Sequence, residues 1–351
     1  MSAHHIPSQH RAGSRILDLA AYLPEQLLTN DELAALYPDW PADKILAKTG
    51  IDVRHVAAPD QTAGDLAFEA ARKLLAQGRV ALAEIDFIIL CTQAPDYVLP
   101  TTACVLQHRL GIATSAGAFD INLGCSGFVY GLSVAKGLVE TGAARCVLLL
   151  TADTYSRYIH PQDKSVRTLF GDGAAATAIV ADDGDDAGAA SIGPFVFGTD
   201  GSGSHNLIVP AGGFRRPRDE RSGDEQTDGS GNVRSDEHLY MNGAEVMAFS
   251  LREVPKAVDA LLHKAQCTTD DIDLFVLHQA NKFMLEALRK RLKVPEEKLP
   301  VRVRDWGNTV SSSIPLALIA LRDEGKLPSG TATMLVGFGV GYSWAACLVN
   351  F

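Results

Sequence analysis

The sequence repeats a short apolar pattern at a fixed distance, and this repeat constrains the fold more than any other feature. EIDFIIL, residues 84–90, matches DIDLFVL, residues 271–277, at an offset of 187. Two further pairs share that offset: residues 147–149 with residues 334–336, and the segment around Cys125 with residues 308–321. Chance agreement between apolar strands is the competing explanation, but three matches at one offset favour two related halves, residues 1–185 and 186–351.

Both halves alternate short apolar runs with helix-like segments. The runs rich in Val, Ile and Leu cover residues 85–93, 144–153, 272–279 and 332–341. Helices are expected over residues 65–78 and 244–265, with an interruption near Pro255, whose ring cannot continue the hydrogen bonds of a helix. Such alternation is typical of an α/β protein whose strands are buried on both faces.

Length and charge exclude several classes of protein. The chain has 351 residues, of which 46% are hydrophobic, so it can bury a large core as two domains or one two-part unit. Its formal charge of −10 argues against nucleic acid as a partner, although a local basic patch for a phosphorylated or acidic ligand stays compatible. No run reaches the roughly 18 apolar residues that span a bilayer, and the first residues lack the apolar core of a secretory signal. We therefore expect a cytoplasmic protein that does not enter a membrane.

Residues 211–238 form a charged, glycine-rich segment that is nearly free of apolar residues. A segment of this composition cannot bury a core of its own. It is either a mobile surface insertion or a lid that carries Arg215, Arg216 and Arg218 over a cleft to an acidic group. The sequence favours the surface insertion and leaves its role open.

One cysteine differs from the other five. The six cysteines contain no C-x-x-C pair, which favours reduced thiols over disulfides or a metal site. Cys125 follows a strand-like run and Gly124, and precedes Gly127 and a long apolar helix-like segment. This is the order of a nucleophile elbow, where the helix N-terminus favours the thiolate. The alternative is a buried cysteine that acts as a small hydrophobe, and the turn alone does not decide between them.

Two further polar residues complete a candidate catalytic set. His278 directly follows a buried strand-like run, and the duplication places the end of this strand at the sheet edge where open α/β sheets bind ligands. Asn308 lies in a glycine turn before another helix. Taken singly, His278 is an ordinary polar residue and Asn308 an ordinary turn or cap residue. Their importance appears only jointly with Cys125, as one candidate catalytic set.

Six motifs in one order resemble those of the 3-oxoacyl-ACP synthase III family, the condensing-enzyme branch of the thiolase superfamily, over nearly the whole chain. They are TGIDVRHVA, GCSGFVYGLSVA, FGDGAAATAIVA, HQAN, GNTVSSSIP and GFGVGYSWAACLVNF. Each motif is weak alone, and their combination is highly specific. The resemblance implies a thiolase-like α/β fold in which two duplicated halves form a five-layered α-β-α-β-α arrangement.

The resemblance also implies a reaction. Cys125 matches the nucleophile that accepts an acyl group, and His278 with Asn308 matches the pair that stabilises the enolate after decarboxylation. The backbone amides of Cys125 and Val340 match an oxyanion hole. The implied activity is a decarboxylative Claisen condensation of an acyl-CoA or acyl-ACP primer with malonyl-ACP in fatty acid or related biosynthesis. The implied enzyme is a homodimer without a cofactor, since coenzyme A and phosphopantetheine thioesters are its substrates.

Several expected substrate contacts depart from the family pattern. Where relatives that use coenzyme A carry Trp or Arg, this chain has Lys44, Lys48, Lys164 and Phe283. Lysine meets phosphate without the bidentate fork of arginine, so coenzyme A recognition is expected to be altered or weakened. Leu99 stands where acetyl-selective relatives place an aromatic ring that reaches across the dimer, which implies room for primers longer than acetyl, unless Met247 or Phe128 closes the tunnel. The other expected substrate contacts are Gly243, Met247 and Asn281.

Other functions stay open at this point. An acyltransferase of the same fold would move the acyl group to a hydroxyl or amine without decarboxylation, and the His278–Asn308 pair argues against this. A non-catalytic subunit of a condensing heterodimer would not need the intact catalytic set. An enzyme like 3-hydroxy-3-methylglutaryl-CoA synthase would need a glutamate base near Cys125, and the segment around Leu99 offers none. The primer, the thioester donor and the pathway are not fixed by the sequence.

Overall fold

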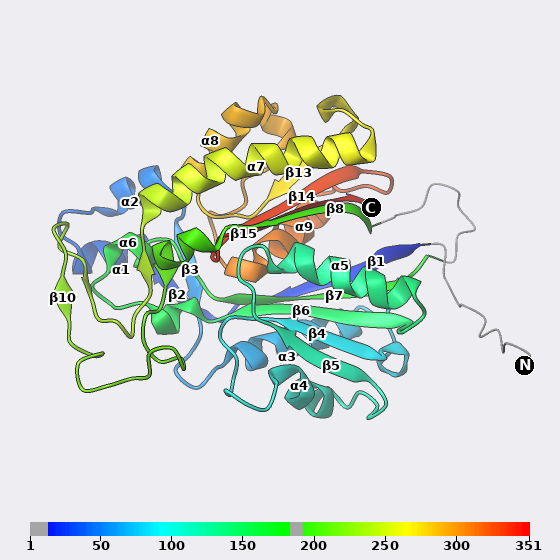
Figure 1. The fold of residues 1–351 in the computed structure, drawn as a ribbon, viewed down its shortest axis with the longest axis horizontal. Helices are drawn as coiled ribbons and strands as arrows, with labels where there is room; N and C mark the ends of the chain where they lie inside the picture. The colour runs from blue at the N-terminus through cyan, green and yellow to red at the C-terminus, as the bar shows by residue number, and fades with distance from the viewer. Residues whose placement is uncertain (1–12, 183–191) are drawn as a thin grey trace, which may run out of the picture.

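The computed structural model describes residues 13–182 and 192–351, which form two large β-sheets with helices between and outside them, and three small two-stranded sheets (Figure 1). The first sheet has five strands in the order β1 (Ser14–Tyr22), β7 (Gly173–Ala181), β6 (Cys146–Asp153), β4 (Phe87–Cys91) and β5 (Gly117–Ile121). The second has four in the order β8 (Ile192–Thr199), β15 (Ser343–Asn350), β14 (Ala332–Gly339) and β13 (Leu274–Leu277). The expected domain boundary between residues 185 and 186 lies outside the described residues and stays a prediction.

The two sheets share one pairing pattern. In the first, β4 and β6 are parallel, and β7 and then β1 follow in antiparallel pairs. In the second, β13 and β14 are parallel, and β15 and then β8 follow in antiparallel pairs. Only β5, which extends the first sheet beyond β4, lacks a counterpart in the second sheet among the described residues. The strands related by the offset of 187 therefore hold equivalent places.

Helices form three layers around the two sheets. The outer face of the first sheet is covered by α3 (Ala63–Ala76) and α4 (Thr102–Leu110), as Figure 1 shows. Between the sheets lie α5 (Gly127–Glu140) and α9 (Ser313–Asp323), which contact strands of both. The outer face of the second sheet is covered by α7 (Gly243–Ala265) and α8 (Lys282–Leu292). The five-layered α/β fold expected from the sequence is confirmed.

The central layer explains the apolar runs on which the sequence analysis depended. Every residue of β6 is buried, because helices cover both faces of its sheet. The helix α5 approaches this sheet closely at Gly131, where a Cβ would lie 2.6 Å from the side chain of Leu149. A helix packed between two sheets has little solvent-facing surface, so α5 and α9 are apolar on most sides.

The expected interruption of a helix at Pro255 is wrong. Helix α7 runs unbroken through this residue. A proline in a helix removes one backbone hydrogen bond, but Val254 and Val258 on either side are buried in the core between α7 and the second sheet. Tertiary packing of this apolar face holds the helix together across the missing bond.

The remaining elements are short and lie at the edges of the layers. The other helices and strands are α1 (Asn30–Leu36), α2 (Ala42–Thr49), α6 (Lys164–Arg167), β2 (Gln26–Thr29), β3 (Val53–Val56), β9 (Leu207–Ile208), β10 (Gln226–Thr227), β11 (Val233–Arg234) and β12 (Tyr240–Met241). The 3₁₀ turns are η1 (Leu82–Glu84), η2 (Tyr155–Tyr158), η3 (Gly201–Asn206), η4 (Thr269–Asp271), η5 (Glu296–Lys298) and η6 (Val310–Ser312). Across the described parts of the chain, every helix is too short or too polar to cross a lipid bilayer.

Candidate active site

A cavity of about 240 Å³ brings together Cys125, His278 and Asn308. These residues come from three separate parts of the sequence and from both halves of the fold. The rest of the lining is mainly apolar and consists of Ser165, Leu169, Phe170, Leu207, Met241, Gly243, Val246, Ala280, Asn281, Met284, Phe338 and Gly339. A small apolar cavity with a few convergent polar groups is the usual form of an active site.

Cys125 lies in the turn between β5 and α5, two residues before the helix begins. The turn is packed too tightly for larger residues. A Cβ on Gly124 would lie 2.6 Å from Oε1 of Gln93 and 2.7 Å from Cγ1 of Val340, and one on Gly127 would collide with the sulfur of Cys91. Gly124 and Gly127 are therefore needed for close packing around Cys125.

The thiol of Cys125 is held in its protonated form. Burial, and then the negative charge of Asp153, raise its pKa to about 12, although hydrogen bonds from the backbone amides of Cys125 and Val340 act in the opposite direction. The backbone amides at the helix N-terminus lower the pKa as expected, but removal of the thiol from water raises it by more. The two amides predicted as an oxyanion hole do converge on the sulfur.

Asp153 is a buried carboxyl group that the sequence analysis missed. It ends β6, where Oδ1 accepts the Gln93 N–H at 2.8 Å and Oδ2 accepts the N–H of Ser311 at 3.2 Å and its hydroxyl at 2.5 Å. Burial raises its pKa to about 7, and these hydrogen bonds reduce the rise. Asp153 thus joins the end of β6 to the turn that carries Asn308.

His278 directly follows β13 and is almost fully buried. Its ring Nδ1 lies 2.6 Å from the hydroxyl oxygen of Ser313, and the ring meets Phe338 edge to face. Burial lowers its pKa to about 3, so the imidazole is neutral at physiological pH.

Asn308 is fixed on both sides by backbone hydrogen bonds. Its N–H donates to the carbonyl of Leu169 at 2.9 Å, and its own carbonyl accepts the N–H of Gly171 at 3.0 Å. The side-chain Oδ1 accepts the N–H of Val310 at 3.0 Å, which leaves the Nδ2 hydrogens for the cavity that Asn308 lines. Val310 adopts φ of 53°, a strained conformation for a β-branched residue, and such strain is found mostly at functional sites.

Not every expected substrate contact reaches the cavity. Gly243 and Asn281 line it, and Oδ1 of Asn281 caps α8 by accepting the Met284 N–H at 2.9 Å. Met247 does not line this cavity, and its expected role as a substrate contact stays a prediction. Its neighbour Val246 lines the cavity instead, while Met247 packs against the adjacent core.

The basic residues and Leu99 also lie outside this cavity. Lys44 and Lys48 lie over the ring of Trp40, 5.4 and 5.5 Å from its centre. The amine of Lys164 donates to the carbonyl of Ser230 at 2.5 Å, and the next residue, Ser165, lines the cavity. Phe283 and Leu99 are 67% and 79% exposed, so neither closes the cavity within one chain. Their expected roles in binding a thioester or a neighbouring subunit stay predictions.

The insertion at residues 211–238 contacts residues 162–164, which directly precede the cavity residue Ser165. Two of the three arginines expected on a lid pair within the insertion, Arg216 with Asp236 at 2.7 Å and Arg218 with Glu237 at 3.1 Å. These pairs hold both side chains within the insertion in this structure, and the lid stays a hypothesis. The insertion is tied to the preceding loop by Val233, whose N–H donates to the carbonyl of Gln162 at 3.3 Å.

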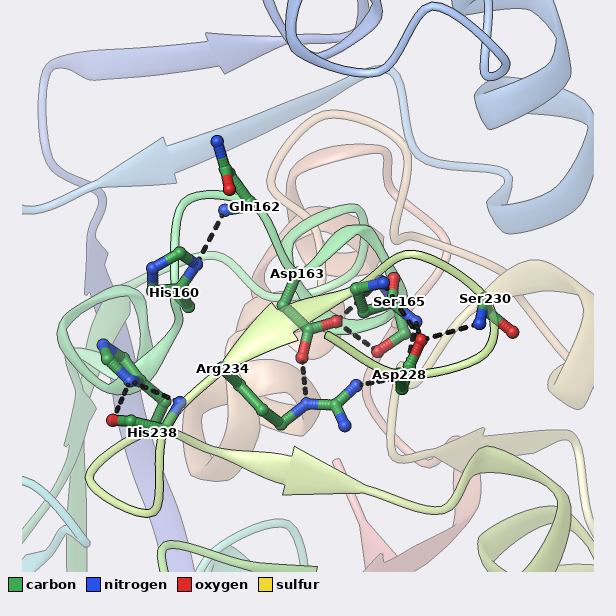
Figure 2. A network of polar contacts seen from close by, with 10 residues as sticks. His160, Gln162, Asp163, Ser165, Asp228, Ser230, Arg234 and His238 are labelled. Atoms are coloured by element: carbon green, nitrogen blue, oxygen red, sulfur yellow. Dashed lines mark hydrogen bonds and ion pairs between the residues drawn. The ribbon is translucent and has the colours of Figure 1, made fainter. Parts of the chain in front are cut away.

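A polar network joins this insertion to the cavity lining (Figure 2). Arg234 lies between two carboxylates, with Nε 2.7 Å from Asp163 and Nη2 2.8 Å from Asp228. Asp163 in turn accepts the N–H of Ser165 at 3.0 Å and its hydroxyl at 2.5 Å. Because Ser165 lines the cavity, Arg234 couples the insertion to the site. Sequence periodicity does not predict the pair of Arg234 and Asp163, which are 71 residues apart in the sequence.

Comparisons with known proteins agree on one family. A family model described as 3-oxoacyl-[acyl-carrier-protein (ACP)] synthase III matches residues 119–201, and the model of the C-terminal part of that family matches residues 262–351. The β-ketoacyl-[acyl-carrier-protein] synthase III of Caldanaerobacter subterraneus is 37% identical over 337 residues, which cover 96% of this chain and 97% of that protein.

Solved structures give the same result. A crystal structure of a 3-oxoacyl-(acyl-carrier-protein) synthase III is 69% identical in sequence and superposes with a TM-score of 0.94, covering 97% of this chain and 100% of the other. A 3-oxoacyl-(acyl-carrier protein) synthase from Burkholderia xenovorans is 38% identical, with a TM-score of 0.87 and coverage of 98% and 95%.

Proposed function

The chain belongs to the 3-oxoacyl-ACP synthase III family, and we propose that it condenses an acyl thioester primer with a malonyl thioester to give a 3-oxoacyl thioester and carbon dioxide. The observation that carries this proposal is the meeting of Cys125, neutral His278 and Asn308 in one apolar cavity. Acyl-CoA or acyl-ACP serves as the primer and malonyl-ACP as the extender. The product enters fatty acid or related biosynthesis.

The first half-reaction loads Cys125. Its sulfur attacks the thioester carbonyl, and the oxyanion that forms is bound by the amides of Cys125 and Val340, which already converge on the sulfur. The carbonyl then re-forms, the bond to the donor sulfur breaks, and the donor leaves as a thiol with the proton that Cys125 gives up. Because the raised pKa of Cys125 leaves little free thiolate, this proton is lost as the carbon–sulfur bond forms.

The second half-reaction forms the carbon–carbon bond. The thioester carbonyl of the malonyl group accepts hydrogen bonds from the ring N–H of His278 and the amide N–H of Asn308, which stabilise the enolate left when carbon dioxide departs. Neutral imidazole is a weak acid, so it holds this enolate without protonating its carbon. The enolate carbon attacks the acyl-Cys125 carbonyl, the carbon–sulfur bond breaks, and the Cys125 thiolate takes up a proton.

The same geometry supports the three alternative functions less well than condensation. An acyltransferase without decarboxylation has no use for two N–H donors opposite the nucleophile. A 3-hydroxy-3-methylglutaryl-CoA-synthase-like reaction needs a carboxylate base in the cavity, and no glutamate is among its lining residues in the described chain. A non-catalytic subunit has no need of a nucleophile held between two converging amides.

The proposal extends to assembly and primer length. Tyr97, Val98 and Leu99 expose 58%, 85% and 79% of their surface, and such an apolar loop is suited to burial against a second copy of the chain. In this homodimer Leu99 enters the neighbour's acyl pocket. Its modest size then admits primers longer than acetyl. The reaction needs no resident metal or cofactor, because the thioesters are substrates.

Intact-mass measurement of Cys125 after incubation with a panel of acyl-CoAs and acyl-ACPs tests the proposal directly. We expect a mass increase equal to one acyl group, its loss when malonyl-ACP is added, and stoichiometric release of carbon dioxide. Cys125→Ala is the control and acquires no acyl group. Product formation by Cys125→Ala near the wild-type rate, or acyl transfer to a hydroxyl or amine without carbon dioxide, would contradict the proposal.

A further inference from the structure

Three consecutive serines cover the end of turn η6 and the first residue of helix α9, and the hydroxyl of each has its own hydrogen-bond partners. Ser311 donates to Asp153 at 2.5 Å. Ser312 contacts the carbonyls of Thr151 and Gly173 at 3.0 and 3.2 Å. Ser313 alone contacts a catalytic side chain, with its oxygen 2.6 Å from Nδ1 of His278.

The hydrogen bonds of Ser313 determine where its proton goes. Its oxygen accepts the backbone N–H of Gln279 at 3.3 Å. The side chain is fully buried, so its hydroxyl hydrogen needs an acceptor within the protein. Among the described residues, Nδ1 of His278 is the one acceptor within hydrogen-bond distance of this hydroxyl. If Nδ1 carried a proton, the Ser313 hydrogen would be buried without a partner, which is the less favourable arrangement.

We propose that Ser313 is a positioning residue that donates to Nδ1 of His278 and thereby holds the imidazole as its Nε2–H tautomer. The role rests on the proposed function, because an N–H that can reach the malonyl carbonyl is useful only if that carbonyl becomes an enolate. Ser313 touches neither substrate nor the reacting atoms. It acts by fixing which ring nitrogen carries the proton.

Other groups do not provide this control. The ring meets Phe338 edge to face on one side, and that contact orients the plane without distinguishing the two nitrogens. The backbone N–H of His278 donates to Val336 at 2.8 Å and fixes the main chain alone. The side chain of Gln279 is committed to the carbonyl of Leu277 at 2.7 Å and the N–H of Arg302 at 2.7 Å. Ser313 is thus the polar side chain that specifies the tautomer.

The test combines a resting-state spectrum with separate half-reactions. We would label histidine with ¹⁵N, assign the His278 ring by the loss of its signals in His278→Gln, and compare wild type, Ser313→Ala, Ser313→Thr and Ser312→Ala. Wild type should show an unprotonated Nδ1 and a protonated Nε2. In Ser313→Ala the Nδ1–H form should appear, and decarboxylation of malonyl thioester should fall about 100-fold, the usual effect of losing one such donor. Loading of Cys125 should be unchanged.

The matched variants separate positioning from folding. Ser313→Thr keeps the hydroxyl and should restore the tautomer and most of the decarboxylation. Ser312→Ala removes a neighbouring buried hydroxyl on the same turn and should keep the wild-type tautomer, whatever its effect on the melting temperature. An Nδ1–H tautomer in wild type, or Ser313→Ala with the wild-type tautomer and decarboxylation rate, would overturn the inference. A wild type with the Nε2–H tautomer that releases no carbon dioxide would contradict the proposed reaction, while the spectrum still supported the role of Ser313.

Discussion

Replacing Gly339 by alanine tests the geometry of the oxyanion hole. A Cβ at this position would lie 2.9 Å from Cβ and 3.0 Å from Sγ of Cys125. Carbon atoms in contact prefer about 3.5–4.0 Å, so the strand must move away by roughly 0.6 Å or more. The amide nitrogen of Val340 is bonded to the carbonyl carbon of Gly339 and must move with it. The hydrogen bond from Val340 to the sulfur is therefore the first contact to be lost.

The expected effect is much larger on catalysis than on stability. Overpacking of this kind costs about 1–3 kcal/mol, which corresponds to a fall of a few degrees in melting temperature for a chain of this size. Loss of one oxyanion-hole donor slows acyl transfer by about 10²–10³-fold. We therefore expect Gly339→Ala to remain folded and to load Cys125 at least about 100-fold more slowly.

Gly137 provides the matched control for this experiment. It lies on the exposed side of α5, and a Cβ there would meet no atom within 4 Å. Alanine in a helix interior is favoured over glycine by about 0.5–1 kcal/mol, so Gly137→Ala should be slightly stabilised and load normally. The measurements are thermal unfolding and a time course of acyl-Cys125 by intact mass. A folded Gly339→Ala protein that loads within twofold of wild type would refute the assignment of the Val340 amide.

Three more predictions concern neighbouring parts of the site. His278→Ala should still load Cys125 but lose malonyl decarboxylation by about 100-fold, and loss of loading with decarboxylation intact would reverse the assigned roles. Because burial lowers the pKa of His278 in the folded protein to about 3, against an ordinary 6.5, the neutral ring contributes fully to stability above pH 6.5, and this contribution is lost as pH falls toward 3. In denaturant unfolding, the stability of His278→Gln should therefore fall less steeply with pH over that range than that of wild type, by up to about 1.4 kcal/mol per pH unit. Equal slopes for the two proteins would exclude this linkage. Arg234→Met should raise the KM for thioesters severalfold and lower the melting temperature, since it leaves the buried Asp163 carboxylate without its counter-charge. As a control, Arg216→Met breaks an exposed ion pair in the same insertion and should leave KM unchanged.

Periodicity and turn residues were enough to locate the strands and to single out Cys125 as a candidate nucleophile. The runs expected over residues 144–153 and 332–341 contain β6 and β14, because strands buried on both faces are continuously apolar. Cys125, His278 and Asn308 each stand at the junction of a strand or turn with a helix, and such junctions converge at one edge of a sheet. Their meeting therefore follows from local patterns once the order of the elements is known.

Two kinds of contact cannot be predicted from these local patterns: those that depend on which face of a helix points to the site, and those between residues far apart in the sequence. Val246 replaces Met247 in the cavity because successive helix positions differ by about 100°, and the sequence does not say which of them faces the site. Asp153 and Ser311 are 158 residues apart, and their contact depends on how α9 packs against the first sheet. The pairs of Arg216 and Arg218 with the insertion's own acids depend likewise on its folded path.

The offset of 187 also pairs the catalytic positions with structural ones. His278 corresponds to Cys91, and Cys125 corresponds to Ser312. The thiol of Cys91 donates to the carbonyl of Leu123 at 3.1 Å and packs against Gly127. The hydroxyl of Ser312 is taken up by backbone carbonyls of the first sheet. The polar groups at the counterpart positions are thus saturated within the protein, and none is left for a substrate.

A further pair of positions at this offset, Asp153 and Val340, explains why only one of the two halves provides a backbone amide that stabilises an oxyanion. Val340, whose amide faces the sulfur of Cys125, corresponds at the same offset to Asp153. A backbone N–H stabilises an oxyanion, whereas burial, and after it the charge of Asp153, raises the pKa of the nearby thiols of Cys125 and Cys91. Asp153 also holds Ser311 and so fixes the turn that carries Asn308. The N-terminal half therefore has Asp153 where the C-terminal half has the Val340 amide, and Asp153 holds in place the turn of the C-terminal half that carries Asn308. The active site around Cys125 depends on this difference between the two halves.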